Sequence, residues 1–326
     1  MKQAVFERQH HADWHAFSTQ LEALERGKPS PGQVDTFPAA YRQLCQQLAL
    51  AESRGYSSQL IEQLHQLALR GHQQFYRHRS PLPGRLAGFI ISDFARSVRA
   101  QWRYVLAASL LFYGSLIGMG LLAYAFPDLV YSLLTPDQVA QMEQMYDPDA
   151  RRLGRFAERG AGDDWLMFGY YVMNNIGIAF QTFASGLLLG LGSLFFLLFN
   201  GLMIGAVAGH LTGIGYHQPF WSFVIGHGAF ELTAITLAGA AGLQLGAAIL
   251  APGRLPRSTA LRQAAKRGIQ LVGGATVFLL IAAFVEAYWS SMTLTTPMIK
   301  YIVGALLWLL VAAYFYFAGR GHHAAE

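Results

Sequence analysis

Residues 186–213 read GLLLGLGSLFFLLFNGLMIGAVAGHLTG, a stretch of 28 residues without an aspartate, glutamate, lysine or arginine. About 20 apolar residues are enough to cross the hydrocarbon core of a membrane as a helix, and lipid admits only helices or closed barrels. No ten-residue alternation typical of barrel strands is visible in the chain, so the stretch predicts membrane-embedded helix.

The composition of the whole chain supports the same class. Of its 326 residues, 53% are hydrophobic and only 13% are charged, whereas a soluble domain carries about 25% charged residues. So few charges cannot cover a water-soluble body of this size. The composition therefore indicates an all-α, polytopic membrane protein and excludes a disordered chain, a nucleic-acid binder and a disulfide scaffold, since Cys45 is the only cysteine.

Long apolar tracts divide a predicted transmembrane domain at 104–319. The tract Trp165–Tyr216 is too long for a single crossing, and glycines interrupt it near its middle. The tracts are Tyr104–Phe126, Trp165–Tyr216, Phe220–Leu250, Gly268–Trp289 and Met298–Phe317.

The charges lie mostly in three blocks. Residues 1–103 carry 13 basic and 8 acidic residues, residues 127–165 carry 4 and 8, and residues 251–267 carry 5 and none. The positive-inside rule places both basic blocks in the cytoplasm and the acidic block outside, in a bacterial inner membrane. Residues 165–216 must then return to the side they left, by two crossings or as a re-entrant pair. About six hydrophobic helices with both termini cytoplasmic satisfy this constraint.

Residues 1–83 are expected to form a cytoplasmic helical domain, because apolar residues recur at three- and four-residue spacing. The predicted stripes are Trp14, Phe17, Leu21 and Leu24, then Leu44, Leu48 and Ala51, then Leu60, Leu64 and Leu67. Histidines are frequent here, but their spacing is irregular and no acid or cysteine completes a ligand set, so no metal site is expected. They are His10, His11, His15, His65, His72 and His78.

Residues 84–103 form a different kind of segment, with Phe89, Ile90, Phe94 and Val98 in an apolar stripe. A basic amphipathic helix before a membrane span is typical of an interfacial segment held by anionic headgroups, and a plain solvated linker is the alternative. The expected headgroup ligands are Arg85, Arg96, Arg99 and Arg103. On the other side, residues 127–165 are expected to form a small extracytoplasmic cap with a helix starting at Thr135-Pro136-Asp137.

Ionisable residues inside a span are candidate functional sites. His227 and Glu231 are four residues apart and share one helix face. They supply two metal ligands, whereas a zinc site needs at least three. The pair therefore leaves three interpretations: a clasp between helices, a proton or ion path, and catalysis.

Further polar residues are Asn174, Asn175, Gln181 and Asn200. Consecutive asparagines suit a helix start or an unwound break. His210 and Glu286 are expected near span ends, where they reach headgroups by snorkelling.

The glycines of the opening stretch, at every fourth position, leave one helix face bare for close helix packing. The packing positions are Gly201, Gly205, Gly209 and Gly213, with Gly186/Gly190, Gly114/Gly118 and Gly242/Gly246 at the same spacing. The partner face belongs either to the same chain or to a second copy, and a symmetric homodimer is expected.

Taken together, these motifs resemble the stage II sporulation protein M family. The resemblance covers roughly residues 100–320 and is concentrated in 174–246. It rests on Asn174-Asn175, Gly186-x3-Gly190, Phe199-Asn200-Gly201-x3-Gly205 and His227-Gly228-x2-Glu231-Leu232-x-Ala234-Ile235. Thr233 is a departure, because such proteins commonly place a proline there, and this puts a kink after Glu231 in doubt.

The resemblance implies a membrane scaffold, since the founding member holds a septal peptidoglycan-degrading complex during spore engulfment and none of the catalytic residues lies in this subunit. We therefore expect a non-enzymatic scaffold that recruits protein partners, without a cofactor. The alternative is a channel or transporter for protons, small ions or lipid around His227 and Glu231. An intramembrane metalloprotease would require additional ligands facing His227.

Overall fold

The computed structural model describes residues 2–26, 33–77, 82–148, 161–292 and 295–320, and every element among them is a helix. The contacts divide the chain into two compact units, Met1–Leu86 and Ala87–Glu326. The second unit contains the membrane helices. The described helices bear out the prediction of an all-α membrane protein with a helical N-terminal region.

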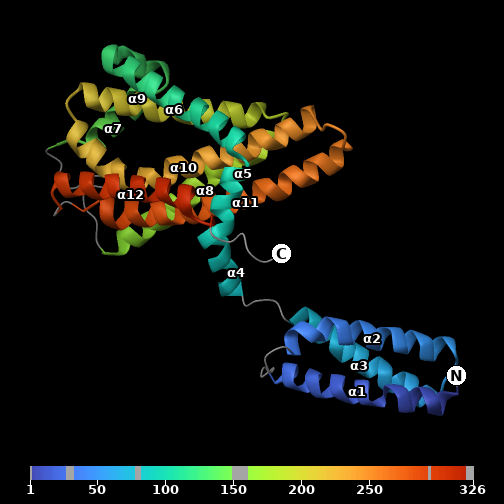
Figure 1. The fold of residues 1–326 in the computed structure, drawn as a ribbon. Helices are drawn as coiled ribbons and strands as arrows, with labels where there is room; N and C mark the ends of the chain where they lie inside the picture. The colour runs from blue at the N-terminus through green and yellow to red at the C-terminus, as the bar shows by residue number, and fades with distance from the viewer. Residues whose placement is uncertain (1, 27–32, 78–81, 149–160, 293–294, 321–326) are drawn as a thin grey trace. The chain divides into compact units, whose positions relative to one another are not determined.

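The N-terminal unit consists of three helices around one apolar core (Figure 1). They are α1 (Gln3–Glu25), α2 (Gln33–Ser53) and α3 (Ser58–Arg77). The predicted stripes meet in this core, where Leu21, Ala51 and Leu64 are fully buried. Gly55 adopts a left-handed φ of +59° between α2 and α3, a conformation that favours glycine. His78 and the predicted loop at 29–32 lie outside the described residues.

Replacing Leu64 with alanine should lower the free energy of unfolding of a fragment of residues 1–86 by about 2–4 kcal/mol, because it opens a cavity in this core. Urea unfolding followed by circular dichroism measures the change. Leu69→Ala is the matched control, since Leu69 lies on the same helix with 45% of its surface exposed. Equal effects of the two substitutions would contradict a core centred on Leu64.

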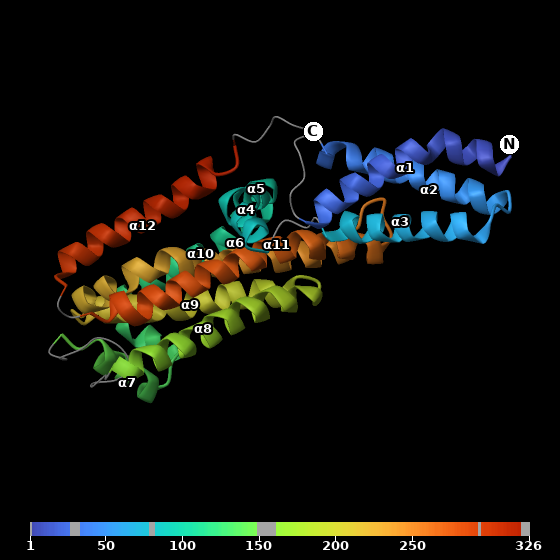
Figure 2. The same cartoon turned by 90° about the horizontal axis from the view of Figure 1, so that it is seen from below.

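The boundary between the units falls within α4, and the membrane unit contains the helices that follow it (Figures 1 and 2). A helical segment of α4, η1 and α5 leads into the first span, and a short cap follows that span. The bounds are α4 Leu82–Gly88, η1 Phe89–Asp93, α5 Phe94–Ala100, α6 Trp102–Ala125, η2 Pro127–Ser132, α7 Pro136–Met145, α8 Ala161–Ala184, η3 Ser185–Leu187, α9 Leu191–Gly213, α10 His217–Leu250, α11 Arg257–Phe284, η4 Val285–Ser290 and α12 Pro297–Phe317.

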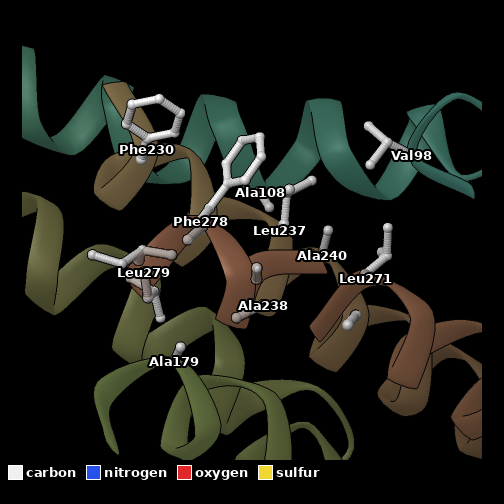
Figure 3. Packing of buried hydrophobic residues seen from close by; sticks show 14 of the residues in the cluster. Val98, Ala108, Ala179, Phe230, Leu237, Ala238, Ala240, Leu271, Phe278 and Leu279 are labelled. Carbon is white, nitrogen blue, oxygen red and sulfur yellow. The ribbon is translucent and has the colours of Figure 1, made fainter. Parts of the chain in front are cut away.

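Five helical stretches of the described chain are long and apolar enough to cross a membrane. They are Trp102–Ala125, Leu191–Gly213, His217–Leu250, Arg257–Ser290 and Pro297–Phe317. α10 is the central one, because 67% of its most apolar stretch is buried, against 17% for α6 and for α12. Figure 3 shows its residues Phe230, Leu237 and Ala240 beside Phe278, Leu279 and Leu271 of α11.

The glycine face of α9 packs on α6 of the same chain. A Cβ on Gly205 would lie 2.3 Å from the carbonyl oxygen of Leu116, and one on Gly209 would lie 2.2 Å from that of Gly120. Gly201 meets Phe112 and Ser115 one turn earlier, and Gly213 is in ordinary contact distance of Tyr124 one turn later. Because the contact positions advance together on both helices, α6 and α9 run parallel. The glycine face that motivated the expected dimer is thus covered within one chain, and the dimer stays a prediction.

The turn between α8 and α9 rests on α10 through a second set of glycines. A Cβ on Gly186 would lie 2.2 Å from the carbonyl oxygen of Gly242, and one on Gly246 would lie 2.3 Å from the nitrogen of Gly190. Gly190 itself has a φ of +84°, which lets the chain reverse between the two helices.

α8 runs antiparallel to α11 over most of its length. Phe183 lies against Gly268 in the first half of α11, whereas Met167 and Tyr171 pack with Ala283 at the end of α11 and with Ala287 of η4. Residues 167–183 of a helix extend about 25 Å, most of a hydrocarbon core. Among the described residues five helices qualify as candidate spans, and α8 is not one of them. The expectation that 165–216 crosses twice or forms a re-entrant pair, within about six hydrophobic helices, therefore stays a prediction.

The apolar stripe of residues 84–103 packs on protein. Phe94 is 2% exposed and fills the space left by Gly274 of α11. The hydroxyl of Tyr314 in α12 donates to the carbonyl oxygen of Ile90. The apolar stripe of this segment therefore contacts α11 and α12 of the same chain. The spacing of apolar residues in the sequence cannot distinguish such packing on protein from insertion into a membrane.

Replacing Gly205 with alanine should destabilise the purified protein in detergent by about 1–3 kcal/mol, because the new Cβ collides with the backbone of α6. The midpoint of thermal unfolding measures the effect. Gly118→Ala is the control, since a Cβ there meets nothing within 4 Å. If Gly205→Ala left the midpoint unchanged, α9 would not pack on α6 as described.

Candidate functional site

A cavity of about 340 Å³ lies among α8, α9, α10 and η4, next to residues of the cap that follows α6. Most of its wall is apolar or aromatic, contributed by residues such as Phe220, Phe223 and Val224. Five polar side chains face it from three different elements. They are Asn174, Asn175, His227, Glu231 and Glu286.

The His227–Glu231 pair lies on α10, one turn apart, with His227 Nε2 4.0 Å from a carboxylate oxygen of Glu231. The His227 ring is 6% exposed, and its Nδ1 is 3.1 Å from the hydroxyl oxygen of Ser290 in η4. This hydrogen bond fixes the ring and directs Nε2 toward Glu231. The hydrogen bond joins α10 to η4, and the clasp remains one of the three interpretations of the His227–Glu231 pair.

Glu286 completes the cluster. A ring nitrogen of His227 and carboxylate oxygens of Glu231 and Glu286 all lie within 4.8 Å of one another, which is compatible with a shared metal ion. Glu286 was expected to reach headgroups at an interface, and that expectation is wrong. Two ligands had been counted from the sequence, and the structure supplies a third.

The local geometry of η4 explains this difference. Val285–Ser290 is a π-helical segment continuing α11, and such wide turns rotate side chains away from α-helical positions, often at functional sites. Tyr288 and Trp289 follow Glu286 closely in the sequence, and such aromatic residues are typical of the membrane interface, which is consistent with the expected contact with headgroups. The ionisable side chain within an apolar tract was the signal that pointed to a site.

A buried lysine holds the same segment. Lys300 of α12 is 2% exposed and its Nζ donates to the carbonyl oxygen of Ser290 at 2.7 Å. Lys300 thus binds the backbone of Ser290, while the side-chain hydroxyl of Ser290 contacts His227. α12 therefore positions Ser290 without lining the cavity.

The arrangement of two carboxylates and one imidazole favours cation binding. Like charges at this separation disfavour simultaneous ionisation, so a shared proton or a bound cation stabilises the cluster. Imidazole nitrogen and carboxylate oxygens are ligands for several divalent metals, and three protein ligands leave further positions open.

Asn174 and Asn175 face this cavity from an uninterrupted helix. α8 continues from Ala161 to Ala184, so the expected unwound break at the asparagines is absent. The side-chain amide of Asn174 donates to the side-chain oxygen of Asn175 at 2.9 Å. This hydrogen bond pairs the two side chains with each other, and α8 stays helical because tertiary context overrides their weak helix propensity.

The other two predicted polar residues lie elsewhere. Asn200 donates from its side chain to the carbonyl oxygen of Phe196 on its own helix at 2.7 Å. Gln181 is exposed on α8. α10 is also continuous past Thr233, whose hydroxyl donates back to the carbonyl oxygen of Ala229.

A hydrogen bond between α7 and α9 holds the cap next to the cavity. Thr135 caps α7 through a capping box with Gln138, as the Thr-Pro-Asp sequence predicted. Glu143 lies 2.7 Å from Nε2 of His210, which is 6% exposed in α9. His210 therefore binds the cap, and its expected role in reaching headgroups is wrong. Residues 149–160 of the expected cap lie outside the described residues.

The four predicted headgroup arginines occupy different environments. Arg99 donates to the carbonyl oxygens of Phe315 and Ala318 at 2.6 Å each, which satisfies the end of α12. Arg96 forms an ion pair with Asp93. Arg85 and Arg103 are exposed, and Arg103 lies over the ring of Trp102. Binding of lipid by these residues stays a prediction.

The fold and this cavity define a multi-pass α-helical membrane protein with a buried, ionisable site between its helices. Residues 107–291 match the model of the family described as Stage II sporulation protein M. The match covers more than half of the chain, and the chain belongs to this family. Residues 4–77 match a domain of unknown function (DUF8413). No curated protein and no solved structure matches the chain.

Replacing Glu143 with alanine should loosen the cap, because it removes a charge-assisted hydrogen bond of roughly 1.5 kcal/mol from a buried partner. Amide hydrogen exchange of α7 should accelerate by about tenfold, measured by mass spectrometry. Gln144→Ala, an exposed neighbour on α7, is the control. Unchanged exchange in Glu143→Ala would show that His210 does not hold the cap.

Proposed function

We propose that this protein translocates a small cation, a proton or a metal ion, through the cavity around His227, Glu231 and Glu286. The observation that supports the proposal is the second carboxylate within 4.8 Å of the His227–Glu231 pair. A clasp between helices needs one donor and one acceptor, and Ser290 already serves His227 in that way. A second acidic group at the same place adds repulsion unless a cation is shared.

The surroundings of the cluster support the same function. Ionisable groups at membrane depth that face a cavity between helices are typical of ion and proton pathways. The side chains of Asn174 and Asn175 offer neutral oxygens to a cation that has lost part of its hydration shell. The cap residues Met142 and Tyr146 line the same cavity, so a cation that enters from this side passes the cap.

The scaffold role is the second candidate. It is favoured by the N-terminal unit, which has its own core and its own family match at residues 4–77. No residue of that unit lines the described cavity. The two candidates are separable because only translocation requires the chemistry of Glu231 and Glu286.

Replacing Glu231 or Glu286 with glutamine should lower cation flux into proteoliposomes by about tenfold or more, because the site loses a charge at the binding position. A pH-sensitive dye reports protons and a metal-sensitive dye reports divalent ions. The midpoint of thermal unfolding should stay close to that of the wild type. Asp128→Asn removes an exposed carboxylate next to the cap and should change neither quantity.

Two outcomes would contradict translocation. The first is a wild-type protein that conducts none of these cations. The second is normal flux in Glu231→Gln with a lowered unfolding midpoint, which would assign the cluster to helix packing and favour the scaffold.

A further inference from the structure

A second cavity, of about 790 Å³, lies where α5 bends into α6. It is lined by residues of these two helices together with Gln244 of α10 and Arg267 and Gln270 of α11. Gln244 is 17 positions after His227 on α10, about 25 Å along the helix. The second cavity is therefore at the opposite end of the bundle from the His227 site.

Positive charge surrounds this cavity. Arg96, Arg103 and Arg267 line it, and Asp93, the acidic residue in its lining, is paired with Arg96. Arg103 and Arg267 are exposed, on two different helices. The first residues of the 24-residue α6 also line the cavity, and the start of a helix carries partial positive charge. The cavity thus favours an anion, and phosphate is a common ligand of such sites.

Two buried amides show that a phosphate alone does not complete the site. Gln101 and Gln244 are 6% and 5% exposed, and the side-chain oxygen of each accepts no hydrogen bond from any described residue. The amide nitrogen of Gln101 donates to the carbonyl oxygen and the hydroxyl of Ser97, so its oxygen is the group left for another donor. A buried acceptor without a donor costs about 1–3 kcal/mol. Phosphate oxygens cannot donate to these acceptors, but hydroxyl groups can.

The position of the cavity indicates where such a ligand would come from. Trp102 lines the cavity with 57% of its surface exposed, at the first residue of a candidate membrane span. Exposed tryptophans and arginines at the ends of spans are typical of the headgroup layer. The mouth of the cavity therefore lies at the depth of lipid phosphates.

We propose that this cavity binds a glycerophosphate group, with the phosphate on Arg103 and Arg267 and with glycerol hydroxyls donating to Gln101 and Gln244. The group is the headgroup of phosphatidylglycerol or a soluble glycerol phosphate, since both present the same chemistry. This site is independent of the cation site, and it is compatible with either proposed function.

Native mass spectrometry of the full chain, released from nanodiscs, tests the site. The nanodiscs contain equal amounts of phosphatidylglycerol, phosphatidylethanol and phosphatidylcholine. Phosphatidylethanol has the same phosphodiester charge without the hydroxyls. The wild type should retain phosphatidylglycerol over phosphatidylethanol by about tenfold, as expected for two added hydrogen bonds. Addition of glycerol 3-phosphate should displace the lipid only if the soluble compound is the ligand.

Two variants separate charge from hydroxyl recognition. Arg267→Gln should lower the retention of both anionic lipids, whereas Gln244→Leu should abolish the preference for phosphatidylglycerol and keep the retention of phosphatidylethanol. Arg262→Gln is the matched control, because Arg262 is exposed on the same helix outside the cavity.

The proposal is overturned if the wild type shows no preference among the lipids and binds no glycerol 3-phosphate. It is also overturned if Arg262→Gln reduces retention as much as Arg267→Gln, which would indicate attraction by the general positive charge of this face. Because Arg267 is exposed, we expect Arg267→Gln to fold normally, so that a loss of lipid retention reports on binding. The thermal unfolding midpoint of each variant checks this.

Discussion

The contact of helix backbones at glycine is the constraint on which the rest of the membrane unit depends. In lipid there is no hydrophobic driving force for helices to associate, so their association depends on close van der Waals packing. α9 lies against α6 at Gly201, Gly205 and Gly209, and the turn before α9 lies against α10 at Gly242 and Gly246. At each of these places a single added carbon would meet backbone or side-chain atoms of the neighbouring helix.

This packing places the polar groups. With the α8–α9 hairpin seated on α10, Asn174 and Asn175 face the same cavity as His227. The wide turn of η4 brings Glu286 to the same cluster, and Lys300 and Ser290 hold this segment. Because most of the wall is apolar, polar groups there need partners, and an imidazole beside two carboxylates is the arrangement on which the proposed cation site rests.

Each end of the bundle has a different chemistry. The end near the cap holds acidic groups at a buried cavity, and the other end holds arginines with two buried glutamine amides. Arg99 shows how a single basic residue in such a region serves structure instead, since it binds the last carbonyl groups of α12. The same residue type thus has different roles that depend on the helix end it reaches.

The sequence alone determined the class, the family, the core stripes of the N-terminal unit and the start of α7, because periodicity, hydropathy and capping are local properties. It also indicated His227 and Glu231, since ionisable residues stand out in apolar tracts. Only the tertiary structure decided that Glu286 joins them, that His210 binds Glu143 and that Gly205 packs whereas Gly118 does not. The physical reason is that a four-residue spacing or a buried charge defines a helix face, while the partner of that face depends on how distant helices are packed.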